Sequence, residues 1–397
     1  MSPPVAPVRQ DWMREHNLSL TLSAVLDASE PVSRAQVAAR TGLSRAAVTN
    51  LVDRLVEAGL VRELAPVALQ RGRPSVPLVP VARTVAALGL EVNVDYLGVR
   101  AVDLTGEVIA EQVLHADLRG SEPAVVAARL GRVTGEVRSR AVALGARIAG
   151  STLALPGLLD SSSVLRTAPN LGWRDLDAIG LLPAELVGGA VGFTVANEAD
   201  LAARAEIRAR RSEDGRPSFF YVSGEIGIGG ARVLGGALSA GSHGWAGEVG
   251  HVVVGSSPTA PSVLTRLEDV AGQRALIRNA QLPEDAPFSD LLEAVAQGSP
   301  AAVAAVRQAG RALGIALAAV AHISDIDEAV LGGTFAALFD TVAGPVEAAL
   351  AELVVFSDWV PVAVTRARAG DYAAMTGAAH TVIDRLVARP SVWLTAS

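Results

Sequence analysis

Residues 221–251 read YVSGEIGIGGARVLGGALSAGSHGWAGEVGH, and this stretch decides the fold of the chain. A short apolar strand leads directly into four glycines between positions 224 and 230, so the backbone there can turn tightly and approach a ligand closely. A second glycine-bracketed turn, at 247–251, carries Glu248 and His251. This combination suits a site for a phosphorylated or polyhydroxylated small molecule. A pair of glycine-rich β-turns without a ligand is the alternative.

The composition indicates a large protein of two or three domains. The chain has 397 residues, half of them hydrophobic, and no cysteine. Disulfides, thiolate catalysis and cysteine-ligated zinc are therefore excluded. No apolar stretch of about eighteen residues lacks charge, so the sequence predicts no transmembrane helix. The N-terminus also lacks the apolar core of a secretory signal, and we expect a cytoplasmic protein.

The charge is unevenly distributed along the chain. Residues 1–80 hold nine arginines against seven acids, whereas the remainder holds 25 arginines against 34 acids. An acidic surface repels nucleic acid, so any contact with DNA is expected in the first segment. The chain contains no lysine, so the lysine of a phosphate-binding P-loop is not available.

The first segment has the pattern of a helix-turn-helix. An apolar face predicts a helix over 17–30. Ser33 then begins a short helix, with a capping box, that runs through Arg40. After a glycine-containing turn, Ser44 begins a third helix with a clean apolar face, which Gly59 ends. Two helices joined in this way favour a DNA reader, and a small helical domain that binds protein is the alternative.

The polar face of the third helix can hydrogen-bond base edges or phosphates. An Arg-Gly-Arg tip between two expected strands suits a wing that reaches phosphates or the minor groove. The run RTGLSRAAVTNLVDRLVEAGLV at 40–61 also resembles winged helix-turn-helix regulators. The residues predicted to bind DNA are Ser44, Arg45, Thr49, Asn50, Arg54, Arg71 and Arg73.

From Val85 onward the pattern becomes that of an α/β protein. Residues 85–114 alternate as a three-stranded meander, and a helical stretch follows at 122–145. The strand–turn–strand pattern returns in 221–251, so two similar α/β halves around a cleft are expected. The run GDYAAMTGAAHTVIDRLV at 370–387 is typical of one amphipathic helix that covers a lobe.

The second segment resembles the ROK family of repressors, uncharacterised reading frames and sugar kinases. The resemblance rests on LALPGLLD, APNLGW, ANEADLAARAE, the 223–251 run and AVLGGTFAAL, in that order. It implies an actin-like, sugar-kinase-like α/β body of two lobes, preceded here by a small winged helix-turn-helix. The implied domains are residues 1–80 for the reader, 85–197 with 371–397 for the first lobe, and 198–370 for the second lobe.

The resemblance also implies a sugar site, position by position. Carboxylates, carboxamides and imidazole suit the vicinal hydroxyls of a sugar. Each of these residues could instead be a satisfied structural polar group. Trp173 and Trp245 flank the expected loops, where stacking on a sugar and burial are both open. The residues matched to sugar contacts are Asn170, Asn197, Glu198, Glu248, His251 and Glu268.

Departures from the kinase pattern argue against phosphoryl transfer. Where the kinases carry Asp-x-Gly-Gly-Thr, this chain has Glu-Val-Asn-Val-Asp at 91–95. The catalytic aspartate is replaced by Glu198, and Glu225 adds a negative charge in the second phosphate loop. Gly332-Gly333 matches the adenosine-side loop and favours a packing turn. The family's zinc-binding cysteines are absent from 252–268, so no metal and no cofactor are expected.

The sequence therefore predicts a sugar-responsive DNA-binding transcriptional regulator of the repressor kind, without catalytic residues. The expected partners are double-stranded operator DNA, a sugar or sugar-phosphate effector, and further copies of the chain in a homodimer or tetramer. Two alternatives stay open: an active ATP-dependent sugar kinase with a fused DNA reader, and a regulator whose body only dimerises.

Overall fold

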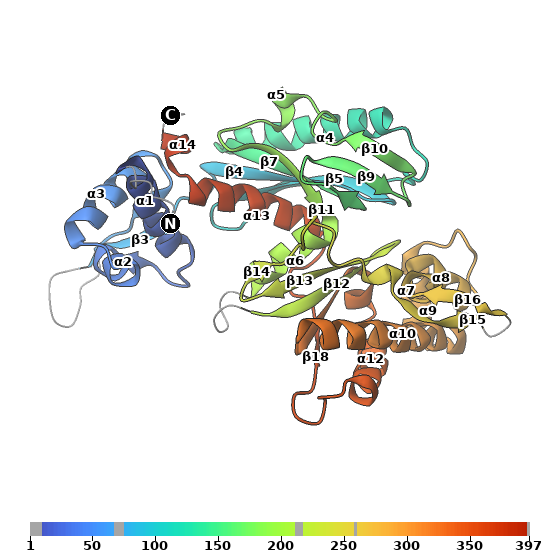
Figure 1. The fold of residues 1–397 in the computed structure, drawn as a ribbon. Helices are drawn as coiled ribbons and strands as arrows, with labels where there is room; N and C mark the ends of the chain where they lie inside the picture. Colours follow the sequence, from blue (N-terminus) through green and yellow to red (C-terminus); the bar gives the residue numbers. More distant parts are fainter. Residues whose placement is uncertain (1–9, 67–74, 211–216, 258–259, 395–397) are drawn as a thin grey trace, which may run out of the picture.

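The computed structural model describes residues 10–66, 75–210, 217–257 and 260–394. A small N-terminal domain lies beside the first of two α/β lobes, next to the C-terminal helices α13 (Ala373–Ala388) and α14 (Ser391–Leu394) (Figure 1). The second lobe lies below the first in this view, across a cleft. The arrangement confirms the predicted fold class, a two-lobed α/β body preceded by a winged helix-turn-helix domain.

The N-terminal domain packs three helices on a small sheet of order β1-β3-β2. Its core consists of Leu18, Leu22 and Val25 of the first helix and the apolar faces of the next two. The elements are α1 (Gln10–Leu26), β1 (Val32–Ser33), α2 (Arg34–Thr41), α3 (Arg45–Glu57), β2 (Val61–Glu63) and β3 (Pro77–Pro80).

The bounds of the first helix differ from the prediction of 17–30, which is wrong at both ends. α1 begins at Gln10 and ends at Leu26. Pro31 disfavours helical geometry at the residue before it, so the chain leaves the helix ahead of this proline. The capping box of α2 is confirmed: the side chain of Gln36 accepts from the Ser33 amide at 2.8 Å, and the Ser33 hydroxyl accepts from the Gln36 amide at 3.3 Å.

The first lobe is built on a five-stranded sheet of order β11-β7-β4-β5-β6. The predicted meander is confirmed as three antiparallel strands, and β7 and β11 continue the sheet in parallel. Successive side chains of a strand point to opposite faces. The strands are β4 (Val85–Val92), β5 (Tyr96–Asp103), β6 (Val108–His115), β7 (Arg147–Leu155) and β11 (Gly192–Asn197).

Two helices cover the two faces of this sheet. Leu88 and Leu90 of β4 share a core with α4 (Pro123–Ala143), whereas Ala87 shares one with α13 (Ala373–Ala388). A Cβ on Gly89 would lie 1.8 Å from the backbone oxygen of Met375, so α13 packs directly on the strand because position 89 has no side chain. A side sheet of β8 (Leu158–Leu159), β9 (Val164–Ala168) and β10 (Trp173–Asp177), with α5 (Ala184–Val187), completes the lobe.

The second lobe repeats a hairpin joined to parallel strands, in the order β14-β13-β12-β17-β18. Its main core lies between this sheet and α10 and α12. The sheet and its helices are α6 (Glu198–Ala209), β12 (Phe219–Gly224), β13 (Ile228–Leu234), β14 (Ala237–Leu238), α10 (Pro300–Ser324), β17 (Glu328–Gly332), α11 (Gly333–Ala337), α12 (Phe339–Leu353) and β18 (Ala363–Arg366).

An insertion between β14 and α10 forms a small subdomain at the edge of the second lobe. Its segments pack on the main core through buried Leu267, Leu276 and Leu291. The elements are the short helix η1 (Val249–His251), β15 (Val253–Ser257), β16 (Ala260–Arg266), α7 (Leu267–Ala271), α8 (Gln273–Asn279) and α9 (Phe288–Ala296).

Among the described residues, α10 is a helix long and apolar enough to cross a membrane. Just over half of its most apolar window is buried inside the second lobe, where the helix packs against α12. Such burial is typical of a core helix, and Gly314 shows why the two helices approach closely: a Cβ there would lie 2.6 Å from the Cβ of Ala349.

Candidate functional site

The second helix of the reader motif, α3, presents a polar face to solvent. Arg45, Asn50 and Arg54 are exposed along it, while Val48 and Val52 on the opposite face are fully buried. This is the division that a recognition helix needs, with its apolar face in the domain core and its polar face free for a DNA groove.

Two of the predicted DNA contacts also serve the helix itself. The Ser44 hydroxyl accepts a hydrogen bond from the Ala47 amide at 3.2 Å and so caps α3. The Thr49 hydroxyl donates to the carbonyl of Arg45 at 2.9 Å, within the same helix. Both residues are exposed. The predicted wing residues Arg71 and Arg73 lie outside the described residues.

A partly exposed ion cluster that the sequence did not predict fixes α3. The guanidinium of Arg34, at the start of α2, donates to Asp53 on α3 at 2.7 Å and to Glu63 on β2 at 2.8 Å. It also donates to the carbonyl of Thr49 at 3.0 Å. One arginine therefore joins three elements of the reader. The planar guanidinium of Arg34, with its fixed set of N–H donors, suits this role. Because its partners are 15 to 29 positions away in sequence, no local pattern predicted the cluster.

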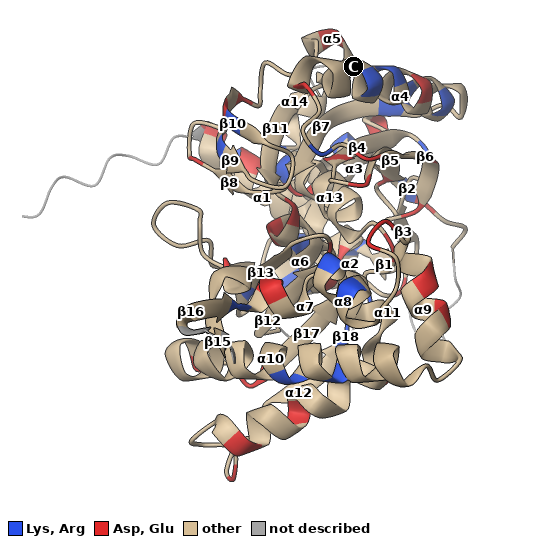
Figure 2. Ribbon diagram, turned by 90° about the vertical axis from the view of Figure 1, so that its right-hand side faces the viewer, with Lys and Arg blue, Asp and Glu red and all other residues tan. Residues whose placement is uncertain are grey.

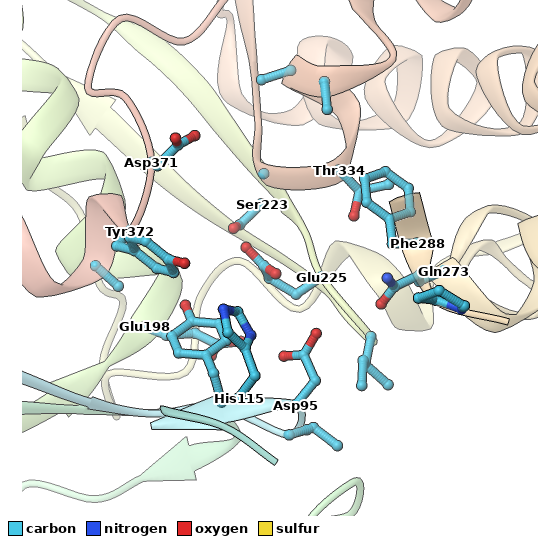
Figure 3. A pocket seen from close by; sticks show the side chains of 18 of the residues that line it. Asp95, His115, Glu198, Ser223, Glu225, Gln273, Phe288, Thr334, Asp371 and Tyr372 are labelled. Carbon is cyan, nitrogen blue, oxygen red and sulfur yellow. The ribbon is translucent and has the colours of Figure 1, made fainter. Parts of the chain in front are cut away.

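A cavity of about 920 Å³ lies between the two lobes. Its walls come from the β4–β5 turn and β6 of the first lobe, and from α6, β12, α8, α11 and the start of α13 (Figure 3). Its lining holds eight acidic side chains and three arginines, so its charge is negative. Acidic positions also mark α9 and α12 on the outside of the second lobe (Figure 2), in keeping with the acidic balance of the body.

Four carboxyl groups converge at one end of this cavity. Glu91 ends β4, Asp95 lies in the β4–β5 turn, Glu198 begins α6, and Glu225 lies in the β12–β13 turn. In Figure 3, Asp95 of the first lobe points toward the turn of the second lobe that holds Glu225. Asp95 stands at the threonine position of the kinase pattern, and Glu198 stands at the position of its catalytic aspartate.

Hydrogen bonds hold the first-lobe members of this group. The hydroxyl of Tyr96 donates to Glu91 Oε1 at 2.7 Å. The side-chain amide of Asn93 donates to the same oxygen at 3.5 Å and to Glu198 Oε2 at 3.3 Å. Asn93 is buried and stands where the kinase pattern has a glycine, so its side chain fills space that the pattern leaves open.

The carboxyl groups perturb one another strongly. Burial raises the pKa of Glu91 to about 7, although its hydrogen bond from Tyr96 opposes the rise. Burial raises the pKa of Glu198 to about 8, and the nearby charges of Glu91 and Asp95 add to the effect. Burial and the same neighbours raise the pKa of Glu225 well above its usual range. Near neutral pH the group therefore retains protons, because burial and mutual repulsion oppose ionisation of all four carboxyl groups.

The glycine pair at the end of β17 is closely packed, and its role as a packing turn stays a prediction; Gly333 also lines the cavity. A Cβ on Gly332 would lie 2.0 Å from the hydroxyl of Tyr221, and one on Gly333 would lie 2.2 Å from the carbonyl oxygen of Gly224. Gly333 also has a φ of 52°. The neighbouring strand and ring occupy the space beside these glycines, which explains their residue type without a nucleotide.

Of the six residues matched to sugar contacts, Glu198 lines the large cavity, while Glu248, His251 and Glu268 lie on the second lobe and Asn170 and Asn197 on the first. The charge of Glu248 is close enough to raise the pKa of Glu198. His251 Nδ1 lies 3.3 Å from Glu268 Oε1. Both side chains are close enough to Glu248 to affect the pKa of its carboxyl group. Burial is the main reason that the pKa of Glu248 is raised.

Asn170 and Asn197 reach this region from the first lobe. A Cβ on Gly227 would lie 3.0 Å from Asn170 Nδ2, so this exposed amide faces the glycine turn of the second lobe. Asn197 caps α6: its Oδ1 accepts from the Ala199 amide at 2.8 Å, and its Nδ2 donates to the carbonyl of Gly157 at 3.0 Å. The amide of Asn197 is thus engaged with backbone.

The two tryptophans near these loops have different roles. Trp173 is 5% exposed, and its indole donates to the carbonyl of Ser121 at 2.7 Å, so it packs in the first lobe. Trp245, on the loop before η1, stacks on His243 and is 40% exposed. Its indole donates to the carbonyl of Leu159 at 2.8 Å. This contact joins the two lobes beside the cleft.

Comparison with known proteins gives the family. The sequence model of the ROK family matches residues 87–385, three quarters of the chain, and that of the MarR family matches residues 19–68. The chain belongs to the ROK family. The match confirms the resemblance seen in the sequence, and the MarR-type match confirms a winged helix-turn-helix at the N-terminus.

Both regulators and kinases resemble this ROK chain. It is 27% identical to the xylose repressor of Bacillus spizizenii over 311 residues, which cover 78% of this chain and 79% of the repressor. Its structure is similar to the ROK family transcriptional regulator described as a homolog of the E. coli MLC protein, with a TM-score of 0.77, 23% identity and coverage of 96% and 99%.

A ROK family glucokinase from Streptomyces griseus, solved with glucose and AMPPNP, is also similar. The TM-score is 0.63 at 22% identity, over 75% of this chain and 98% of the glucokinase. The regulator therefore matches reader and body, whereas the glucokinase matches a length equal to the ROK body. Because a regulator and a kinase share the fold of the body, the fold alone does not distinguish regulation from catalysis. The side chains in the cleft have to be compared instead.

Proposed function

We propose that this ROK chain is a sugar-responsive DNA-binding transcriptional regulator of the repressor kind. The observation that carries the proposal is that one chain combines a winged helix-turn-helix with a ROK cleft. In this cleft, carboxyl groups stand at the positions that match the kinases' phosphate-binding loops. α3 would enter a major groove, where Arg45 and Asn50 suit guanine and adenine edges. The similarity to a xylose repressor supports a sugar as effector.

The side chains of the cleft favour sensing over phosphoryl transfer. Asp95 and Glu225 stand on opposite lobes where a nucleotide's phosphates would need positive or neutral partners. Glu198 replaces the aspartate that the family resemblance assigns as base, with a side chain one methylene longer and bonded by Asn93. Proton abstraction depends closely on placement. We therefore propose that the chain has no kinase activity.

The effector would act by shifting the arrangement of the two lobes. Asn170 on the first lobe and Glu248, His251 and Glu268 on the second are candidates to bind sugar hydroxyls from both sides. A ligand that binds both lobes prefers one arrangement of them and stabilises it. Because two-fold operators pair helix-turn-helix readers, we propose a homodimer or tetramer acting on DNA in the cytoplasm.

The reader assignment can be tested with the full-length protein. An operator is selected from random duplexes, and its affinity is measured by fluorescence anisotropy at fixed salt. Arg45→Ala and Asn50→Ala should each weaken specific binding by about tenfold, since a bidentate base contact is worth roughly 1–3 kcal/mol. Arg174→Ala removes an exposed arginine of the first lobe and serves as the control. Unchanged affinity in both reader variants would contradict the proposal.

Sugar sensing is tested by thermal shift over a panel of sugars and sugar phosphates. A ligand at about a hundred times its Kd adds roughly 2.7 kcal/mol to the free energy of unfolding and raises the Tm. His251→Ala with Glu248→Gln should abolish the shift. If no compound moves the Tm or alters operator affinity, the body serves only to assemble the regulator.

A further inference from the structure

The end of the cleft that holds Glu91, Asp95, Glu198 and Glu225 contains carboxylate oxygens with no hydrogen-bond donor among the described residues. Glu91 is 2% exposed, and among the described residues its Oε2 has no hydrogen-bond partner. The Oδ1 of Asp95, in the adjoining turn, is also buried without a partner. Both residues line the cavity. A buried acceptor without a donor costs about 1–3 kcal/mol, more when it is charged, so the site is incomplete as it stands.

The charges around these acceptors point to a positive ligand. Glu198 and Glu225 lie close enough to Glu91 for each to influence the pKa of the other groups. Two of the arginines that line the cavity are already engaged with acids: Arg119 pairs with Asp117 and Arg366 with Asp340. Burial raises the pKa of the Asp95 carboxyl group even though His115 and Arg119 offset part of its charge, so the surplus of carboxyl groups at this end is only partly balanced.

Aromatic rings stand beside the carboxyl groups. The rings of Tyr96 and Tyr372 meet edge to face at 5.2 Å, and His115 lies 6.2 Å from Tyr96. Tyr372 holds its place at the start of α13 with a φ of 53°. Arg100 already lies 5.8 Å from the centroid of the Tyr372 ring, which shows that this ring accepts a cation.

We propose that this end of the cleft binds a small organic cation through a primary ammonium group. An ammonium group offers three donors, which would satisfy Glu91 Oε2, Asp95 Oδ1 and the carboxyl of Glu198 or Glu225. Among the described residues, no group of three acidic or histidine side chains is placed to hold a metal ion, so the donor chemistry fits an amine better. Since its acceptors come from both lobes, the cation would favour the closed cleft.

Glu91, Asp95 and Glu225 are not among the residues matched to sugar contacts, so variants at these positions test the ammonium site apart from sugar sensing. The test measures the Tm and the heat of binding of the full-length protein at constant ionic strength. Putrescine is compared with butane-1,4-diol, and glucosamine with glucose, so each amine has a neutral counterpart. Magnesium chloride forms a third arm. At least one amine should bind and raise the Tm, while its neutral counterpart does not.

Variants locate the effect. Glu91→Gln with Glu225→Gln should weaken amine binding by at least about tenfold, because charge-assisted hydrogen bonds are lost. Glu347→Gln with Glu352→Gln, on the outer helix α12, is the matched control and should bind normally. Asp95→Asn provides a second variant if the double variant unfolds.

Three results would overturn the inference: neither amine binds at millimolar concentration, the variants bind amines as well as the control does, or magnesium alone stabilises the protein. Equal shifts with glucose and glucosamine would reject the ammonium site and leave sugar sensing intact. Amine binding that depends on Glu91 and Glu225, with no effect of any neutral sugar, would support the ammonium site and count against sugar sensing.

Discussion

The indole of Trp393 donates a hydrogen bond to the backbone carbonyl of Ala58, 3.3 Å away. Ala58 ends the recognition helix α3, and Trp393 lies in the C-terminal helix α14 (Ser391–Leu394), which follows α13. The guanidinium of Arg147, on the first-lobe sheet, stacks 4.4 Å from the centroid of the same indole. One side chain thus joins the DNA reader to the lobe that forms half of the cleft.

The connection continues to the cleft itself. Residues of the reader, the first-lobe sheet and α13 form one hydrophobic core, which includes Leu18, Val85 and Leu386. The other end of α13 begins beside Tyr372, which lines the cavity. A movement of α13 on lobe closure would therefore reach α3 without crossing a flexible linker.

Trp393→Ala should destabilise the protein and uncouple the reader. Loss of a buried tryptophan costs about 3–5 kcal/mol of unfolding free energy, which denaturant unfolding would measure. Operator binding should become less sensitive to the effector, as seen by anisotropy with and without ligand. Trp393→Phe keeps the ring and loses the bond to Ala58, so it should be milder. A fully effector-responsive Trp393→Ala protein would rule out this route.

Arg34→Ala should weaken operator binding although Arg34 need not touch DNA. The change removes the bonds to Asp53, Glu63 and the Thr49 carbonyl, and α3 loses its anchor to α2 and β2. These groups are partly exposed, so we expect about 1–2 kcal/mol of lost stability in the reader.

Arg34→Lys distinguishes the effect of the hydrogen bonds that anchor α3 from the effect of the positive charge at position 34. Lysine keeps the charge but cannot reproduce the fixed set of N–H donors, so it should restore little of the affinity. Anisotropy and hydrogen exchange on α3 measure the two effects. Wild-type affinity in Arg34→Lys would show that charge alone matters.

The stability of the protein should fall as the pH rises through neutrality. The folded chain holds protons on Glu91 and Glu198, whose pKa values are about 7 and about 8, whereas the unfolded chain releases them near the ordinary value of 4.5. The folded state therefore binds more protons. For each such proton, the free energy of unfolding decreases by about 1.4 kcal/mol per pH unit between about 4.5 and the folded pKa.

Glu198→Gln should flatten this decline, because glutamine cannot ionise. Urea unfolding at several pH values between about 5 and 8 measures the slope. Glu347→Gln, at an exposed position, is the control and should keep the wild-type slope. Identical slopes in both variants would show that Glu198 does not hold its proton to a higher pH in the folded chain than in the unfolded one.

The purified protein should not phosphorylate sugars. A coupled assay with ATP and a panel of hexoses should give no turnover above background, because the carboxyl groups of Asp95 and Glu225 offer the phosphates no positive partner. Glu198→Asp should not restore activity, since the Asn93 and Asp95 side chains still occupy the phosphate loop. Phosphorylation that disappears in Glu198→Ala would establish the kinase alternative.

Local signals in the sequence determined the elements and the class of fold. Ser33 and Ser44 marked the starts of α2 and α3, because a capping hydroxyl acts within three residues. The alternation over 85–114 marked a meander, and the glycine turns of 221–251 led to the ROK resemblance. Each of these signals depends on neighbours in the chain, where periodicity and turn chemistry suffice.

Only the tertiary structure decided how distant residues meet. Arg34 with Glu63, Trp393 with Ala58, and Glu91 with Glu225 are pairs separated by tens to hundreds of residues. Their proximity depends on how the lobes and the reader pack, and packing involves the whole core rather than any local pattern. The sequence thus determined that Asp95 and Glu225 carry carboxyl groups in the two segments that match the kinases' phosphate-binding loops. The fold decided that they gather from two lobes into one buried site, where low solvation raises their pKa values and where, among the described residues, Oε2 of Glu91 finds no donor.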